Sequence, residues 1–330
     1  MKKIATILFL VLLFAGATSA QRTGHPGIDL YKEGKNADAV ASLSSAVKQT
    51  QYKSDPEIWN YLGLASVETG EIKNATEAFE KAIKLAPSRS TYHANLAYVY
   101  LLATKTSKGE SEAQKAISLD PRNVAAYSIR GVSRLWALRF DDAEKDASQM
   151  IAIEPGNPDG YILRSRVTIG RLGSRVTEGS TAQKELPFLE EAVSILKNGA
   201  ELSKQHSKHK EIVSELESLT AFYDYFSKDR SVPAGSATPE PGTTPIKILN
   251  KPHAAYTDRA RQANVEGTIR IAALLGSSGR VEQVLVLKRL GSGLDEQAVN
   301  AARAVKFVPA TRNGLPISKV IILEYGFSIY

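Results

Sequence analysis

Prolines recur at intervals of 34 residues in the first two-thirds of the chain, at Pro87, Pro121 and Pro155. Each follows a short apolar stretch with a helix-forming composition, and each precedes another such stretch. A proline ends a helix because it lacks the N–H that the next turn needs and its ring clashes with the preceding turn. A fixed interval of about 20 to 50 residues predicts stacked copies of one unit, here a pair of antiparallel helices.

Within each interval, small residues would let two helices approach closely and large apolar residues would fill the gaps between them. In the copy that ends at Pro87 these residues are Gly63, Ala75 and Ala82, and Trp59, Leu62 and Phe79. The pattern resembles the tetratricopeptide repeat (TPR). It returns in the fourth copy as Tyr127, Gly131, Ala143, Ala147, Met150 and Pro155, and more weakly in the third as His93, Leu96, Ala97, Ala113, Ala116 and Pro121.

The ends of the repeat region are less regular. A degenerate first copy surrounds Gly34 and Ala39, and a fifth copy begins at Pro158 and loses the register after Gly170. Residues 185–226 still have a helical pattern, and we expect them to cap the last apolar face. Residues 21–228 are therefore predicted to form one helical solenoid. Within it, Arg130 would be partly buried, and the resemblance implies Asp146 as its partner.

A solenoid of this kind is a binding scaffold, and the resemblance implies that its concave face is lined by fixed positions of each first helix. Such a groove could hold an extended or helical peptide with apolar anchors. The alternative is that Leu101 and Trp136 only pack against neighbouring repeats. The candidate groove residues are Glu57, Asn60, Leu64, Val67, Tyr98, Leu101 and Trp136.

The pattern changes from helical to alternating after residues 229–245, whose prolines, glycines and small polar residues predict an extended linker. Thr268 to Leu275 and Val281 to Leu287 read as two strands around the turn Gly276 to Gly279. Leu294 to Val305 has helical spacing, and Lys319 to Ser328 alternates again as a third strand. Residues 246–330 are thus predicted to form a small antiparallel sheet, in the order β-β-α-β, with a helix across it.

An ordered set of landmarks in this segment resembles the C-terminal domain of TonB-family energy transducers. The landmarks include Lys251-Pro252, Tyr256, Ala260-Arg261, Val265 to Thr268, Gly293 to Asp295, Phe307, Pro309-Ala310, Gly314, Pro316 and Phe327. The chain is therefore predicted to be an α+β multidomain protein, a TPR-type α-solenoid followed by a small TonB-like domain.

The resemblance implies that this domain binds a short extended segment of an outer-membrane transporter by β-augmentation, in which a peptide adds a strand to an exposed sheet edge. The last strand is the candidate edge. In the alternative, Lys319 and Glu324 blunt this edge, which then pairs only within the protein or with a second copy. The candidate edge residues are Val320, Ile321, Ile322, Leu323, Glu324, Tyr325 and Phe327.

Residues 1–20 have the layout of a secretory signal peptide, with Lys2 and Lys3 before an apolar run and small residues at the end. We expect cleavage after Ala17 or Ala20, which would export the protein to the periplasm. The alternative is an uncleaved anchor in the inner membrane, although the uncharged stretch lies at the lower limit of the ~17–25 residues needed to span a bilayer. The sequence contains no cysteine, which excludes disulfides and thiolate metal sites.

The net charge of +7 is unevenly distributed, because residues 246–330 carry twelve basic and six acidic side chains. Such an excess could steer the domain toward anionic lipid headgroups or cell-wall polymers, or be only a solvated surface. No basic motif interleaved with aromatic residues suggests nucleic acid. Nor does any catalytic or phosphate-binding motif occur, so we expect no enzyme, no cofactor and no small-molecule substrate. His206 and His209 lack a third metal ligand and are surrounded by lysines, so no metal site is predicted.

The sequence thus favours a non-catalytic envelope adaptor whose solenoid binds one protein while the TonB-like domain engages another. The first alternative is a membrane-anchored TonB-type energy transducer. The resemblance implies that such an anchor carries a histidine facing a proton-driven motor, and residues 1–20 contain none, which disfavours this alternative. The second is a structural scaffold whose basic terminal domain binds cell-wall polymer.

Overall fold

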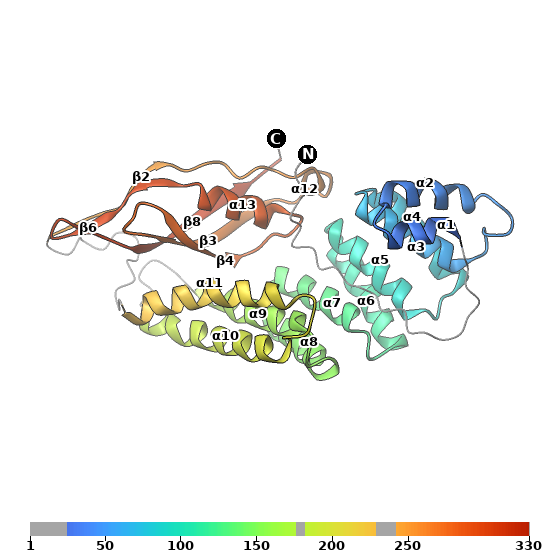
Figure 1. Ribbon diagram of the computed structural model, residues 1–330, viewed down its shortest axis with the longest axis horizontal. Coiled ribbons are helices and arrows are strands. Elements are labelled where there is room, and N and C mark those ends of the chain that lie inside the picture. Colours follow the sequence, from blue (N-terminus) through green and yellow to red (C-terminus); the bar gives the residue numbers. More distant parts are fainter. Residues whose placement is uncertain (1–24, 176–181, 229–241, 330) are drawn as a thin grey trace. The chain divides into compact units, whose positions relative to one another are not determined.

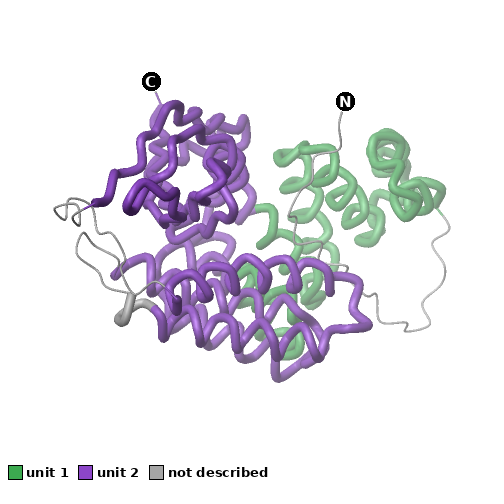
Figure 2. Tube along the Cα trace, turned by 60° about the vertical axis from the view of Figure 1, so that its left-hand side comes forward, with its two compact units in different colours: residues 1–99, 111–129 green, residues 100–110, 130–330 purple. Residues whose placement is uncertain are grey.

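The computed structural model describes residues 25–175, 182–228 and 242–329. The predicted signal peptide, residues 1–20, and most of the predicted linker, residues 229–241, lie outside the described residues. The chain divides into two compact units (Figure 2). Unit 1 comprises residues 1–99 and 111–129, and unit 2 comprises residues 100–110 and 130–330. The predicted domain boundaries remain predictions, since these units follow a different division.

Paired helices build unit 1 (Figure 1). They are α1 (Pro26–Lys32), α2 (Asn36–Ala46), α3 (Pro56–Glu68) and α4 (Ile72–Leu85). Asp55 caps α3 by accepting a hydrogen bond from the Glu57 N–H at 2.9 Å, and Pro56 follows as the first helical residue. Gly63 lies directly against Phe79, where an added Cβ would approach the ring to 2.6 Å. The predicted pairing of a small residue with a large one is confirmed here.

Three helices contain residues of both units: α5 (Ser90–Leu102), α6 (Thr106–Leu119) and α7 (Val124–Trp136).

The turns between paired helices require a residue in the left-handed conformation. Gly34 and Gly70 take this conformation at φ of 75° and 80°, and Thr104 and Leu138 take it at 55° and 59°. Since a side chain is strained in this region, the later turns keep the geometry at a cost that glycine avoids.

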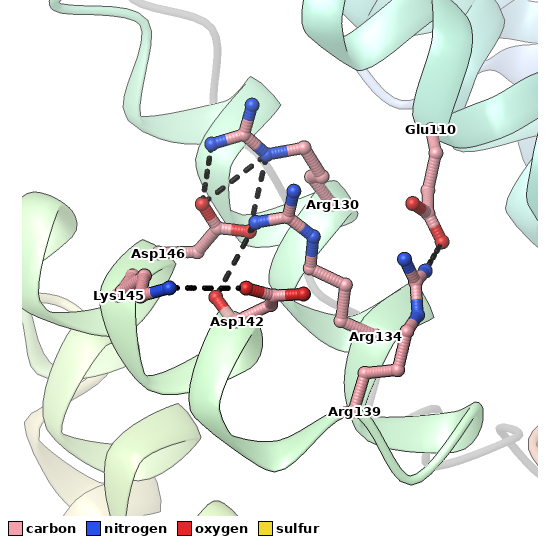
Figure 3. Close-up of polar contacts among 7 residues, drawn as sticks. All are labelled: Glu110, Arg130, Arg134, Arg139, Asp142, Lys145 and Asp146. Carbon is pink, nitrogen blue, oxygen red and sulfur yellow. Dashed lines mark hydrogen bonds and ion pairs between the residues drawn. The ribbon is translucent and has the colours of Figure 1, made fainter.

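Four helices of unit 2 are α8 (Phe140–Ile153), α9 (Pro158–Arg175), α10 (Ala182–Leu202) and α11 (His209–Lys228). Arg130 and Arg134 converge on the Asp146 carboxylate (Figure 3). Arg130 Nη2 lies 2.5 Å from Asp146 Oδ1, and Arg134 Nη1 lies 2.8 Å from Oδ2. The predicted partnership of Arg130 with Asp146 is thus confirmed, and Arg134 is a further partner.

The main sheet of the terminal segment has the strand order β4-β3-β8, and its strands are antiparallel. The elements are β3 (Gly267–Leu275), β4 (Val281–Lys288), α13 (Leu294–Arg303) and β8 (Lys319–Phe327). The predicted β-β-α-β order is confirmed. Ile269, Ile271, Ala273 and Leu275 lie in one core together with α13, as their alternation indicates.

Several short elements complete this segment and were not predicted. They are β1 (Thr243–Thr244), β2 (Lys247–Asn250), α12 (Asp258–Gln262), β5 (Lys306–Val308), β6 (Ala310–Arg312) and β7 (Leu315–Ile317). β2 pairs with β5, and β6 lies between β1 and β7. An Asn313-Gly314 turn, in which both residues have positive φ, joins β6 to β7.

The second face of the main sheet is also buried. Its apolar side chains share a core with α9, α10 and α11. Arg270 Nη1 donates to the Gly173 carbonyl oxygen at 2.9 Å, and an added Cβ on Gly173 would lie 2.5 Å from the Leu287 carbonyl oxygen. Helices that were expected to cap the repeats therefore also cover the terminal sheet. The sheet residues in this core are Ala272, Leu274, Leu287 and Val320.

Candidate functional site

Strand β8 forms one margin of the three-stranded sheet, because β3 is its neighbour on one side and the strand order ends there. Its register with β3 runs without a bulge from Lys319 opposite Leu275 to Phe327 opposite Gly267. An unbroken register keeps successive side chains on opposite faces of the sheet. The strand is therefore regular over its nine residues.

The two faces of β8 differ in burial. Leu323, Tyr325 and Phe327 lie in the core beside α13, and Ile321 packs against it. On the opposite face Val320 joins the core of α9, α10 and α11. Ile322, by contrast, is 38% exposed, and Glu324 is exposed and pairs with Arg270 at 3.2 Å. The candidate edge residues thus lie on one strand, and most of their side chains hold the sheet together.

Because these side chains are engaged, a partner would have to use the backbone of β8. Lys251 Nζ donates to the Glu324 carbonyl oxygen at 2.7 Å, which places that oxygen within reach of groups outside the sheet. In an antiparallel strand the backbone groups of alternate residues point to the same side. We therefore expect the N–H and carbonyl of Ile322 to face the same margin.

Tyr325 gives this margin an unusual polar feature. Among the described residues, its buried hydroxyl has no hydrogen-bond partner. Burial raises the pKa of Tyr325 to about 12, so the hydroxyl is neutral at physiological pH. Lys251 Nζ also lies 4.9 Å from the centre of the Tyr325 ring, within the range of a cation–π contact. The sequence analysis used Lys251 only as a landmark, and nothing in its spacing indicated this contact.

In unit 1, the candidate groove residues lie on two helices. Glu57, Asn60, Leu64 and Val67 are on α3, and Tyr98 is on α5. Glu57 is exposed, Leu64 and Tyr98 are half-buried, and Val67 is buried. Asn60 is also buried, and its side-chain oxygen accepts a hydrogen bond from Asn95 Nδ2 at 2.8 Å. An amide buried in this way holds the two helices together and offers little surface to a ligand.

The remaining two groove candidates lie in unit 2. Leu101 is buried. Trp136 is half-buried, and its ring lies against Gly291, where an added Cβ would meet the ring at 2.6 Å. Gly291 belongs to the turn before α13, so a residue of the terminal segment occupies one face of Trp136.

The described residues contain no group of three or more His, Cys, Asp or Glu side chains that could hold a metal ion. His206 and His209 both make local hydrogen bonds: His206 Nδ1 accepts from the Lys208 N–H at 3.1 Å, and His209 Nδ1 lies 3.4 Å from Ser203 Oγ.

The bidentate pair of Arg166 with Glu215, at 2.9 and 2.7 Å, links α9 to α11. Burial opposes ionisation of Glu215, but Arg166 lowers its pKa below the ordinary value. The pair is therefore charged, and it has a structural role.

These features describe a TPR-type helical solenoid followed by a small β-rich domain of TonB type. Residues 252–329 match the family model of the Gram-negative bacterial TonB protein C-terminal domain. Residues 27–90 match a tetratricopeptide-repeat family model. The repeats are associated with protein–protein interaction and the terminal family with the bacterial envelope. Both families are generally non-catalytic.

Similar solved structures are helical repeat proteins. A thermophilic TPR protein of Thermus thermophilus is 18% identical with a TM-score of 0.46, and the match covers 59% of this chain and 96% of that one. MamA is 18% identical with a TM-score of 0.45, covering 58% and 99%. The Arabidopsis OM64 TPR domain is 28% identical with a TM-score of 0.34, covering 34% and 93%. No curated protein matches the chain. Among the described helices, none has the length and apolar character needed to cross a membrane.

Proposed function

We propose that this chain is a non-catalytic adaptor of the bacterial envelope that acts in the periplasm. Its TPR region binds one protein, and its TonB-like domain captures an extended segment of another along β8. The observation that carries this proposal is the position of β8 at the end of the strand order β4-β3-β8. An end strand leaves one row of backbone donors and acceptors for a further strand.

Two features support β8 as the edge that receives the partner. The other end strand, β4, contacts α9 and α11 on one face of the sheet and α13 on the other. Along β8, the Glu324 carbonyl oxygen is met by the long, flexible side chain of Lys251. An ammonium group on a flexible stem can be displaced by an incoming N–H at a modest cost in side-chain entropy. A protein segment such as the periplasmic end of a TonB-dependent outer-membrane transporter is the partner that the family match favours.

The repeat region supplies the second binding surface in this proposal. On α3 and α5, Glu57, Leu64 and Tyr98 combine one charge with apolar surface and are the accessible groove candidates. Trp136 and Leu101 are the less suitable ones, because the first already contacts Gly291 and the second is buried. We therefore expect partner binding by the repeats to depend on the α3–α5 surface.

The test is a proline substitution on β8. Ile322→Pro removes one of the N–H groups that we expect to face the margin, and prolines are tolerated on edge strands when that N–H faces solvent. We expect the variant to retain its fold by circular dichroism and to lose at least about tenfold in affinity for transporter-end peptides, measured by calorimetry, because a ladder hydrogen bond is lost and the added strand is interrupted.

Ile322→Thr is the matched control, since it keeps the N–H and a β-branched side chain. It should bind the peptides as the unmodified protein does. Equal binding by a folded Ile322→Pro variant would refute capture along β8. N-terminal sequencing of the protein from native envelopes tests the periplasmic location. A mature start at Thr18 or Gln21 supports it, whereas an intact segment from Lys2 to Ala20 in membranes supports an anchored energy transducer instead.

A further inference from the structure

A two-stranded ribbon next to the main sheet has one anchored face and one open face. β2 and β5 pair antiparallel, with Ile248 opposite Phe307 and Lys247 opposite Val308. Paired residues in antiparallel strands point to the same face. Phe307 is buried in the core beside α13, so its side of the ribbon is the anchored one, while Ile248 opposite it is 39% exposed.

The other face of the ribbon carries Lys247 and Val308, and Lys306 lies on it two residues before Val308. Leu249, next to Ile248, adds to this face at the point where the register of β2 shifts between Ile248 and Asn250. We call these four residues the outer face of the ribbon. Leu249 is 60% exposed and Val308 is 47% exposed. Two large aliphatic side chains and two lysines therefore share one accessible surface.

The charge around this face has a single sign. β2, β5, β6 and β7 together contain three basic residues, Lys247, Lys306 and Arg312, and no acidic residue. Neither Lys247 nor Lys306 forms an ion pair within the described part of the chain. β7 adds Leu315, which at 71% has the largest exposed fraction among the large hydrophobic residues described.

We propose that the outer face of the ribbon binds a membrane surface containing anionic lipid headgroups. The lysines would attract the negative surface, and Leu249 and Val308 would enter the apolar boundary beneath the headgroups. A soluble polyanion would satisfy the lysines but leave both aliphatic side chains in water, and a neutral protein surface would leave the lysines uncompensated. The combination therefore favours a lipid surface. This inference goes beyond the adaptor function and does not depend on strand capture by β8.

The test uses the full chain and two kinds of vesicle, phosphatidylcholine alone and phosphatidylcholine mixed with phosphatidylglycerol. Two double variants divide the outer face by chemistry: Lys247→Gln with Lys306→Gln, and Leu249→Ser with Val308→Ser. Each variant carries the same residues 1–20 as the unmodified protein, so any contribution of that segment is common to all. The matched control is Leu119→Ser on α6, where the leucine is 44% exposed.

We expect the unmodified protein to co-sediment with the mixed vesicles and to bind more weakly as salt is added. Replacing both lysines should lower the partition coefficient about tenfold or more. Replacing both aliphatic residues should lower it by a similar factor, because less apolar surface is buried. Leu119→Ser should leave it unchanged.

Two outcomes would overturn the proposal. One is vesicle binding that neither double variant changes. The other is a dependence on the lysines alone, with soluble polyphosphate competing fully, which would assign the face to a polyanion such as a wall polymer. All the replaced side chains are exposed, so circular dichroism should show that every variant is folded.

Discussion

A hydrogen bond recurs at the start of three of the repeats although the residue that donates it changes. Trp59 Nε1 donates to the Lys53 carbonyl oxygen at 2.9 Å, and Tyr161 Oη to the Pro155 carbonyl oxygen at 3.1 Å. His93 Nε2 lies 2.9 Å from the Pro87 carbonyl oxygen. In each case the carbonyl lies six residues earlier, near the end of the preceding helix or in the loop that follows it. The position therefore selects for a flat ring with a polar tip, a requirement that three residue types can meet.

His93 has a second partner, because its Nδ1 lies 2.7 Å from Glu112 Oε2. Burial would raise the pKa of Glu112, but hydrogen bonds from Lys115 and His93 lower it below the ordinary value of 4.5. A lowered carboxyl pKa stabilises the folded state above the ordinary value, and this contribution is lost as the pH falls through the folded pKa.

Glu112→Gln should therefore reduce stability at pH 7, and its difference from the unmodified protein should shrink as the pH falls below about 4.5. Urea midpoints at pH 7 and at pH 4 measure this change. Glu77→Gln is the control, because Glu77 is paired with Lys73 only at 4.0 Å on an exposed surface. If Glu112→Gln lowered stability equally at both pH values, the folded state would not lower the pKa of Glu112 as described.

The Asp146 carboxylate holds two guanidinium groups in a site where all three side chains are largely buried. Asp146→Ala would leave Arg130 and Arg134 without this anion, and removing one member of a buried ion pair costs about 3 kcal/mol or more. We expect a matching fall in the free energy of unfolding, measured by urea titration. Asp142→Ala on the same helix removes a more exposed carboxylate paired with Lys145 and should change stability little. Equal effects of the two substitutions would contradict a special role for Asp146.

At the scale of elements, long periodic segments were predictable and short ones were not. The alternation in β3, β4 and β8 and the helical spacing in α13 are long enough to identify each element. The strands β1, β2, β5, β6 and β7 have two to four residues each, too few to define a period. Their pairing joins segments far apart in sequence, as Lys247 with Val308 shows.

The contact between α9 and β4 depends on a glycine within a helix. Gly173→Val would place a side chain 2.5 Å from the Leu287 carbonyl oxygen, a backbone atom that cannot rotate away. We expect a loss of about 2 kcal/mol in stability from overpacking and faster amide hydrogen exchange along β4. Gly156→Ala is the control, since the nearest atom to its added Cβ is 3.6 Å away. Unchanged exchange in β4 of the Gly173→Val variant would show that helix and strand do not depend on this fit.

At the scale of the whole chain, the sequence predicted the two kinds of architecture but not the packing of the terminal sheet on α9 and α11. One signal was present, because Ala272 to Leu275 is apolar at every position, as in strands that are buried on both faces. The chain position of the candidate edge was also predictable. The contacts of Lys251 with Glu324 and of Trp136 with Gly291 were not, because they join distant segments through single side chains.

The shared core of Ala272, Leu274, Leu287 and Val320 with the helices constrains how such a chain could be assembled from parts. If the terminal domain were fused to other repeats without α9 and α11, this apolar face of its sheet would be exposed to water. A recombination event that keeps this core intact would join the two sequences before α9. Residues 158–329 are therefore the segment that could be exchanged as one piece.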